Sequence, residues 1–196
     1  MVLYASALLF QACRTLPPRH PDDLCAIFRE NPRWYQASRE SNQRWRVPVP
    51  LMLAVLHQES RFRANAKPGW RTVLGFIPVG RLSSAYGYGQ VKDGTWNDYI
   101  ERSGRSRAER DDFGDVVDFI GWYGDVIHRV TGVAKDDAYH LYLGYHEGPA
   151  GFARGSYQDK PWLLSVARKV EARADAYGLQ YQTCPGPPDE GGIWPF

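Results

Sequence analysis

One acidic side chain stands where the sequence predicts the apolar face of a helix. Residues 51–63 follow helical spacing, and Glu59 falls in the middle of an apolar stripe. The stripe consists of Met52, Val55, Leu56 and Phe62. An unpaired buried charge is costly, so Glu59 either has a polar partner or has a pKa raised until it is neutral near pH 7. A neutral carboxylic acid can protonate a glycosidic oxygen, although a structural glutamate held by hydrogen bonds explains the stripe equally well.

Three short segments resemble, in order, the motifs of one enzyme family. Residues 58–62 read QESRF, residues 84–90 read SAYGYGQ, and residues 143–149 read LGYHEGP. They are similar to the Glu-Ser, Gly-Leu-Met-Gln and Ala-Tyr-Asn-Ala-Gly-Pro segments of the lysozyme-like lytic transglycosylases, the SLT-domain family. The resemblance extends over residues 22–183. It implies a mainly α, lysozyme-like α+β fold, with helices around a substrate cleft and at most a small β-hairpin.

The same resemblance implies roles for individual side chains. Glu59 corresponds to the catalytic acid, Ser60 to the serine that follows it, and Gln90 to the glutamine that supports the cleft wall. Tyr145 matches the tyrosine whose hydroxyl approaches the catalytic carboxyl, and one phenol hydrogen bond can orient a glutamic acid without keeping it ionised. The remaining residues expected to bind substrate or support the site are Gly87, Tyr88 and His146.

Three positions depart from the family pattern. Gly89 stands where many members carry methionine, and His146 and Glu147 replace asparagine and alanine. These departures leave the sugar contacts at the three positions open.

The family's reaction, as the resemblance implies it here, cleaves the bond between N-acetylmuramic acid and N-acetylglucosamine without water and leaves a 1,6-anhydro end. One carboxyl group is then sufficient, because the nucleophile belongs to the substrate. A hydrolytic muramidase needs a second carboxylate, for which Asp93 and Asp98 are the nearest candidates, although helix capping or solvation explains both. A non-catalytic peptidoglycan-binding protein is the other alternative.

Helical spacing, caps and prolines predict the elements that must position these residues. Asn31-Pro32 and Lys160-Pro161 are typical helix starts, and Asp136 or Asp137 can cap another helix. Between Ala64 and Ser84 the periodicity disappears, and this segment is expected to form a small hairpin or an irregular flap. The predicted helices cover residues 22–30, 32–45, 51–63, 95–103, 107–130, 137–146 and 161–178.

Composition excludes several function classes. A net charge of +2 is too balanced for a nucleic-acid-binding protein. Seven Trp and twelve Tyr suit a carbohydrate groove, although packing explains any one of them.

The sequence has no complete zinc-binding motif. His57-Gln58-Glu59 lacks the Pro-Cys-x-x-Cys of the zinc deaminases, and no H-E-x-x-H occurs, so we expect neither metal nor cofactor.

The ends of the chain suggest an envelope protein. Residues 1–13 look like a signal peptide whose Ala12-Cys13 resembles a bacterial lipobox, with Cys13 the lipidated residue. A tether (14–21), one catalytic domain (22–184) and a Pro/Gly-rich tail (185–196) follow. Cys25 and Cys184 are expected to be a disulfide or two free thiols. We therefore expect a periplasm-facing monomer, bound to the outer membrane through its lipid and acting on peptidoglycan.

Overall fold

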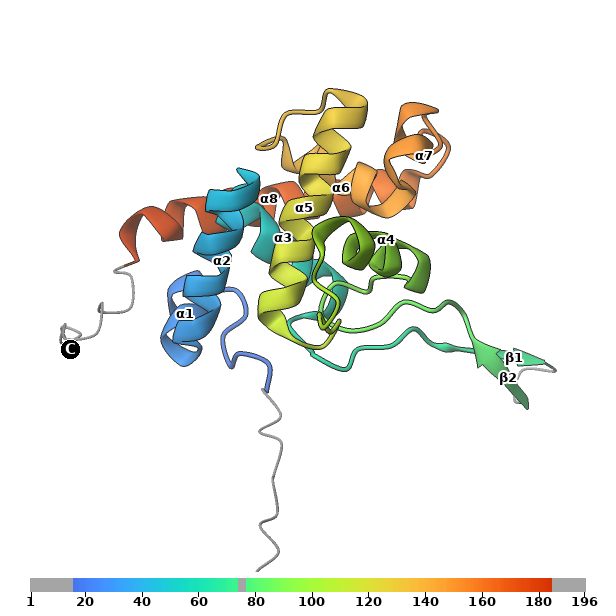
Figure 1. Cartoon of the computed structure of the whole chain (residues 1–196), viewed down its shortest axis with the longest axis horizontal. Coiled ribbons are helices and arrows are strands. Elements are labelled where there is room, and N and C mark those ends of the chain that lie inside the picture. Colours follow the sequence, from blue (N-terminus) through green and yellow to red (C-terminus); the bar gives the residue numbers. More distant parts are fainter. Residues whose placement is uncertain (1–15, 74–76, 185–196) are drawn as a thin grey trace, which may run out of the picture.

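The computed structural model describes residues 16–73 and 77–184, and almost all their regular structure is helical (Figure 1). This confirms the prediction of a mainly α fold with at most a small β-hairpin. The lipobox-like segment with Cys13 and the tail 185–196 lie outside the described residues. The elements are α1 (Leu24–Glu30), α2 (Pro32–Trp45), α3 (Val49–Ser60), β1 (Trp70–Val73), β2 (Ile77–Arg81), α4 (Asp93–Ser103), α5 (Phe113–Thr131), α6 (Ala138–Glu147), α7 (Pro149–Ala153) and α8 (Pro161–Thr183).

Aspartate side chains and prolines open several of the helices, as predicted at Asp137, Pro32 and Pro161. The side chains of Asp23, Asp112 and Asp137 accept hydrogen bonds from backbone amides in the first turns of α1, α5 and α6. Pro32 and Pro161 open α2 and α8, where a missing amide proton costs nothing. The cap at Asp112 also explains why α5 begins at Phe113, later than the predicted residue 107.

Other helix ends differ from the prediction. Helix α3 stops at Ser60, because Arg61 and Phe62 take left-handed backbone conformations with φ of 51° and 60°. Helix α8 continues through Gly178 to Thr183, since a glycine weakens a helix without having to end it. The short helix α7 was not predicted, although it begins at a proline that follows Gly148.

Helix α3 lies in the middle of the helical body, packed against α8 and in contact with α2 and α5 (Figure 1). Its residues from Leu51 to Leu56 are all buried, so this helix is apolar nearly all round. Glu59 is therefore carried near the C-terminal end of a helix that is largely buried.

None of the described helices is both long enough and apolar enough to span a bilayer.

The predicted hairpin is formed by β1 and β2, which pair antiparallel and project away from the helices (Figure 1). Trp70 pairs with Arg81 and Val73 pairs with Ile77. The register shifts between Arg71 and Thr72. Both strands lie within the segment from Ala64 to Ser84, for which a hairpin or a flap was expected.

A disulfide between Cys25 and Cys184 joins α1 to the end of α8, with a Cα–Cα distance of 5.3 Å. Nearby, the backbone amide of Leu24 donates to Gln180 Oε1 at 2.7 Å. The side-chain amide of Gln180 donates in turn to the backbone carbonyl of Asp22 at 3.2 Å. The two ends of the described domain are therefore tied together.

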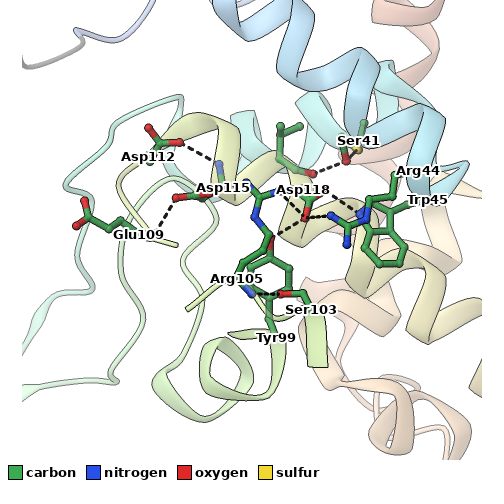
Figure 2. Close-up of polar contacts among 12 residues, drawn as sticks. Ser41, Arg44, Trp45, Tyr99, Ser103, Arg105, Glu109, Asp112, Asp115 and Asp118 are labelled. Carbon is green, nitrogen blue, oxygen red and sulfur yellow. Dashed lines mark hydrogen bonds and ion pairs between the residues drawn. The ribbon is translucent and has the colours of Figure 1, made fainter. Parts of the chain in front are cut away.

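A buried carboxylate, Asp118, connects three helices, and Figure 2 shows its neighbours converging on it. Trp45 Nε1 of α2 donates to Oδ1 at 2.9 Å, and the Tyr99 hydroxyl of α4 donates to Oδ2 at 2.7 Å. Arg105 Nη1 lies 3.2 Å and Arg44 Nη1 lies 3.8 Å from Oδ2. Because burial raises the pKa of Tyr99 well above its usual range, this phenol remains a donor.

Replacing Asp118 with asparagine is expected to lower the free energy of unfolding by about 3 kcal/mol. The substitution removes the charge that compensates two guanidinium groups. It also puts an amide donor where one carboxylate oxygen accepts hydrogen bonds. Urea denaturation at pH 7 measures this loss. The same substitution at Asp175, which is exposed on α8, is the control and should change stability by less than about 0.5 kcal/mol. Equal effects of the two variants would show that the contacts of Asp118 do not contribute to the free energy of unfolding beyond those of an exposed aspartate.

Candidate active site

Glu59 lines a cleft of about 450 Å³. The cleft wall comes from α3, from the segment between β2 and α4, and from α5 and α6. Aromatic rings of Phe119, Tyr123 and Tyr145 form part of it, beside polar groups such as Gln90. A concave site that combines aromatic rings with many polar side chains suits a small ring-shaped substrate unit such as a sugar.

Glu59 receives a hydrogen bond from a tyrosine of α6, but not from the one that the motif resemblance indicates. The Tyr142 hydroxyl donates to Glu59 Oε1 at 2.9 Å. The Tyr145 hydroxyl instead donates to the backbone carbonyl of Gly89 at 2.7 Å. The expectation that Tyr145 orients the carboxyl is therefore corrected: both phenols lie at the site, and Tyr142 makes the bond.

The surroundings of Glu59 favour its neutral form. Burial raises the pKa of Glu59 to about 7, while the hydrogen bond from Tyr142 acts in the opposite direction. Burial also raises the pKa values of Tyr142 and Tyr145 far above their usual range, so both phenols are neutral donors. Near neutral pH, Glu59 can therefore either donate or accept a proton, as a general acid–base group requires.

The glycine-rich segment before α4 has the shape that its glycines allow. A Cβ atom on Gly89 would lie 2.9 Å from the Tyr145 hydroxyl and 3.0 Å from Val116 Cγ1, which explains why a larger residue is absent there. Gly87 has φ of +79°, and a Cβ on it would lie 1.8 Å from the carbonyl oxygen of Arg110. Gly87 and Gly89 therefore let the backbone approach α6 and the segment before α5.

Gln90 fastens this segment to the loop that follows α3. Its Nε2 donates to the backbone carbonyls of Ala66 and Gly87 at 2.9 and 3.0 Å. Gln90 itself has φ of 49°, and it lines the same cleft as Glu59. These bonds are what a residue supporting the cleft wall needs.

Comparison with protein families decides which family has this site. The family model described as the transglycosylase SLT domain matches residues 1–184. The chain belongs to the transglycosylase SLT domain family. Such domains act on peptidoglycan in the cell envelope, so this SLT domain has a lytic-transglycosylase type of function. Comparisons with curated proteins and with solved structures give no match.

Two of the residues expected to bind substrate or support the site lie in the core of the SLT domain. Ser60 is 2% exposed, and its hydroxyl donates to the carbonyl of Leu56 within α3. Tyr88 is 1% exposed and packs against the rings of Trp34 and Phe113. Neither residue lines the cleft. They can therefore support the site only through packing.

The nearest carboxylates predicted for a hydrolytic reaction lie elsewhere. Asp93 pairs with Arg110 at 2.7 Å, and Asp98 is exposed on α4. Neither lines the cleft of the SLT domain. The second carboxylate in the cleft wall is Glu147, to which sequence reasoning gave no role.

Glu147 is held as an anion by its neighbours. Lys160 Nζ lies 2.7 Å from both carboxylate oxygens, and Ser156 and His146 also contact them. Burial alone would raise its pKa, but these hydrogen bonds and the Lys160 charge lower the pKa of Glu147 to about 2. The cleft thus holds one carboxyl group, Glu59, with a pKa of about 7. The other, Glu147, is ionised at neutral pH, and both of its oxygens are bound by Lys160.

Other parts of the SLT domain do not offer the same chemistry. A larger groove of about 840 Å³ runs between α3 and α8, where Asp22, His57 and Arg173 line it. Burial lowers the pKa of His57 to about 4, so this imidazole is neutral at physiological pH. Within residues 16–73 and 77–184, no three or more His, Cys, Asp or Glu side chains are grouped to hold a metal ion.

Proposed function

We propose that this SLT domain cleaves the bond between N-acetylmuramic acid and N-acetylglucosamine without water, with Glu59 as the single acid and then base. The observation that carries the proposal is a carboxyl group in the cleft with a pKa of about 7 and one phenol hydrogen bond from Tyr142. A group with this pKa is protonated often enough to act as an acid and loses its proton readily enough to act as a base.

The reaction has two proton transfers. Glu59 gives its proton to the glycosidic oxygen as the bond from that oxygen to C1 of the muramic acid breaks. The ionised Glu59 then takes the proton of the C6 hydroxyl while O6 forms a bond to C1. The nucleophile is part of the substrate, so its attack needs no bound water and has the advantage of an intramolecular reaction. The products are a 1,6-anhydro end and a free 4-hydroxyl group, and Glu59 is protonated again.

The state of the other carboxylates supports this mechanism over hydrolysis. A hydrolase needs a second carboxylate, either to activate water or to attack C1. Glu147 has both oxygens bound by Lys160, and Asp93 is bound by Arg110 outside the cleft wall. Neither is therefore placed as a free base or nucleophile.

Product analysis tests the proposed function. Purified sacculi are digested with the protein, and the soluble fragments are analysed by mass spectrometry with and without borohydride reduction. Fragments that end in 1,6-anhydro-muramic acid and resist reduction are expected. Reducing ends would show a hydrolytic muramidase, and intact sacculi would show a binding protein; either outcome overturns the proposal.

Replacing Tyr142 with phenylalanine is expected to shift the pH dependence of cleavage. In the unmodified protein the hydrogen bond from Tyr142 lowers the pKa of Glu59, so the loss of this bond should raise that pKa above about 7. Activity, which needs protonated Glu59, should then persist to higher pH, while the maximal rate falls about tenfold because the carboxyl is less well oriented. Rates of sacculus solubilisation from about pH 5 to about pH 9 measure both effects.

Tyr145→Phe is the matched control for this variant. It removes a phenol of the same helix that bonds to Gly89 and leaves the bond to Glu59 intact. Its alkaline limb should stay where it is in the unmodified protein. An equal shift in both variants, or a shift of Tyr142→Phe toward lower pH, would contradict the role given to Tyr142.

The placement of the enzyme in the envelope is also a proposal. Residues 22–184 would form the catalytic domain, and lipid attached to Cys13 would hold it at the periplasmic face of the outer membrane, through the tether 14–21. The lipobox-like Ala12-Cys13 and the proline-rich tether support this arrangement. The disulfide between Cys25 and Cys184 suits an oxidising compartment.

A further inference from the structure

Trp162 leaves a large aromatic surface open at the start of α8. It is 56% exposed and is the one aromatic ring among the exposed large hydrophobic side chains of residues 16–69 and 80–184. Water around an indole ring is unfavourable, so most tryptophans are largely covered by protein. An exposed tryptophan next to a binding cleft therefore indicates a contact with a ligand.

The ring of Trp162 continues the cleft that contains Glu59. His146 lines that cleft, and its ring packs edge-to-face with Trp162 at 5.1 Å between centroids and 77° between planes. Trp162 itself does not line the cleft, so it adjoins the cleft wall through its contact with His146. The two rings form an aromatic and polar rim at this edge of the cleft.

This rim is held in place before any ligand binds. His146 Nδ1 lies 3.1 Å from Glu147 Oε1, and Lys160 Nζ contacts both oxygens of Glu147 at 2.7 Å. The side chain of Glu147 is only 6% exposed. Because Lys160 directly precedes α8 and Glu147 ends α6, the ion pair fixes the start of α8 against the end of α6. A platform that is already ordered loses little entropy when a ligand binds.

We propose that Trp162 and His146 form a further sugar-binding subsite, which takes an N-acetylhexosamine unit beyond the two that flank the cleaved bond. The proposal rests on the proposed function, because it assigns the occupant of the rim to the same glycan strand. An indole face carries negative potential, and the C–H groups on one face of a pyranose ring are weakly positive, so the two surfaces stack. The Lys160 ammonium and the His146 ring can bond to hydroxyl or acetamido groups at the edge of that sugar.

The subsite predicts that strand length matters. A short glycan that fills only the sugars around the cleaved bond does not reach Trp162, whereas a long strand does. Trp162 should therefore contribute to the binding of long strands alone. A tryptophan that served only the packing of α8 would affect both substrates equally or neither.

Binding measurements with the Glu59→Gln protein test this inference, because binding can be measured there without cleavage. The ligands are long glycan strands freed of peptides and the disaccharide of N-acetylglucosamine and N-acetylmuramic acid, titrated by calorimetry. Trp162→Ala should weaken the binding of long strands about tenfold and leave that of the disaccharide unchanged. Trp162→Phe, which keeps an aromatic face, should recover part of the loss. Leu179→Ala is the matched control, since Leu179 is 69% exposed on the same helix.

Three outcomes would overturn the subsite. One is equal binding of long strands by the Trp162→Ala and Leu179→Ala proteins. Another is an equal loss for the disaccharide and the long strands. A third is unchanged glycan binding together with reduced binding to vesicles of phosphatidylethanolamine and phosphatidylglycerol, which would make Trp162 a membrane contact. Failure of the proposed function is a separate result, since it would appear as absent or hydrolytic cleavage by the unmodified protein.

Discussion

Replacing Glu59 with glutamine is expected to reduce peptidoglycan cleavage by about a thousandfold and to leave glycan binding nearly unchanged. Glutamine keeps the size of the side chain and can still accept the hydrogen bond that Tyr142 donates to Glu59 Oε1. It cannot release a proton to the glycosidic oxygen or take one from the C6 hydroxyl. Release of soluble fragments from sacculi measures the rate, and calorimetry with glycan strands measures the binding.

The matched control for this prediction is Glu40→Gln. Glu40 is an exposed residue of α2, so the same chemical change there should leave cleavage at the level of the unmodified protein. A Glu59→Gln protein that cleaves as fast as this control would remove Glu59 from the reaction. Loss of both cleavage and folding, seen by circular dichroism, is not expected because the neutral amide resembles the neutral acid that the cleft favours.

Reduction of the disulfide between Cys25 and Cys184 is expected to lower the free energy of unfolding by about 5 kcal/mol. The bond links residues 159 positions apart, so it removes a large part of the conformational freedom of the unfolded chain. The ends of α1 and α8 that it joins also hold each other through the bond between Leu24 and Gln180. Urea denaturation with and without a reductant measures the effect.

A double variant, Cys25→Ser with Cys184→Ser, separates the disulfide from other effects of the reductant. Its stability should equal that of the reduced protein and should not change when reductant is added. A loss below about 1 kcal/mol on reduction would mean that the disulfide does not contribute to the stability of the domain as its loop length implies.

Features set by neighbouring residues were the ones that the sequence predicted well. The cap at Asp137 and the prolines at the first positions of α2 and α8 were predicted, because such residues mark helix starts through contacts within one turn. The stripe around Glu59 indicates an acid among apolar neighbours for the same reason. Burial and the raised pKa of Glu59 agree with that interpretation.

Features that depend on packing between helices could not be predicted in the same way. Tyr142 and Tyr145 lie three residues apart on one side of α6, so spacing alone cannot say which hydroxyl reaches Glu59. The way α6 packs decides between them: the Tyr142 hydroxyl reaches Glu59, and the Tyr145 hydroxyl reaches the Gly89 carbonyl. Phe62 is likewise buried although it lies outside α3, because packing rather than helical periodicity places it.

The same limit applies to Glu147. Its sequence position indicates only a departure from the family pattern. Its partner Lys160 directly precedes α8, and α7 lies between the two residues in the sequence. The pairing therefore exists only once α6, α7 and α8 are folded together. The exposed ring of Trp162 next to His146 is a product of the same arrangement.

The central claim is that the protein surroundings raise the pKa of Glu59 to about 7, so that both the protonated and the ionised carboxyl are well populated at neutral pH. A pH titration of the glutamate side-chain carboxyl carbons by ¹³C NMR tests it most directly, with the Glu59→Gln protein used to assign the signal. The predicted result is a midpoint for Glu59 of about 7. A midpoint near 4, the value of a solvated glutamate, would contradict the account.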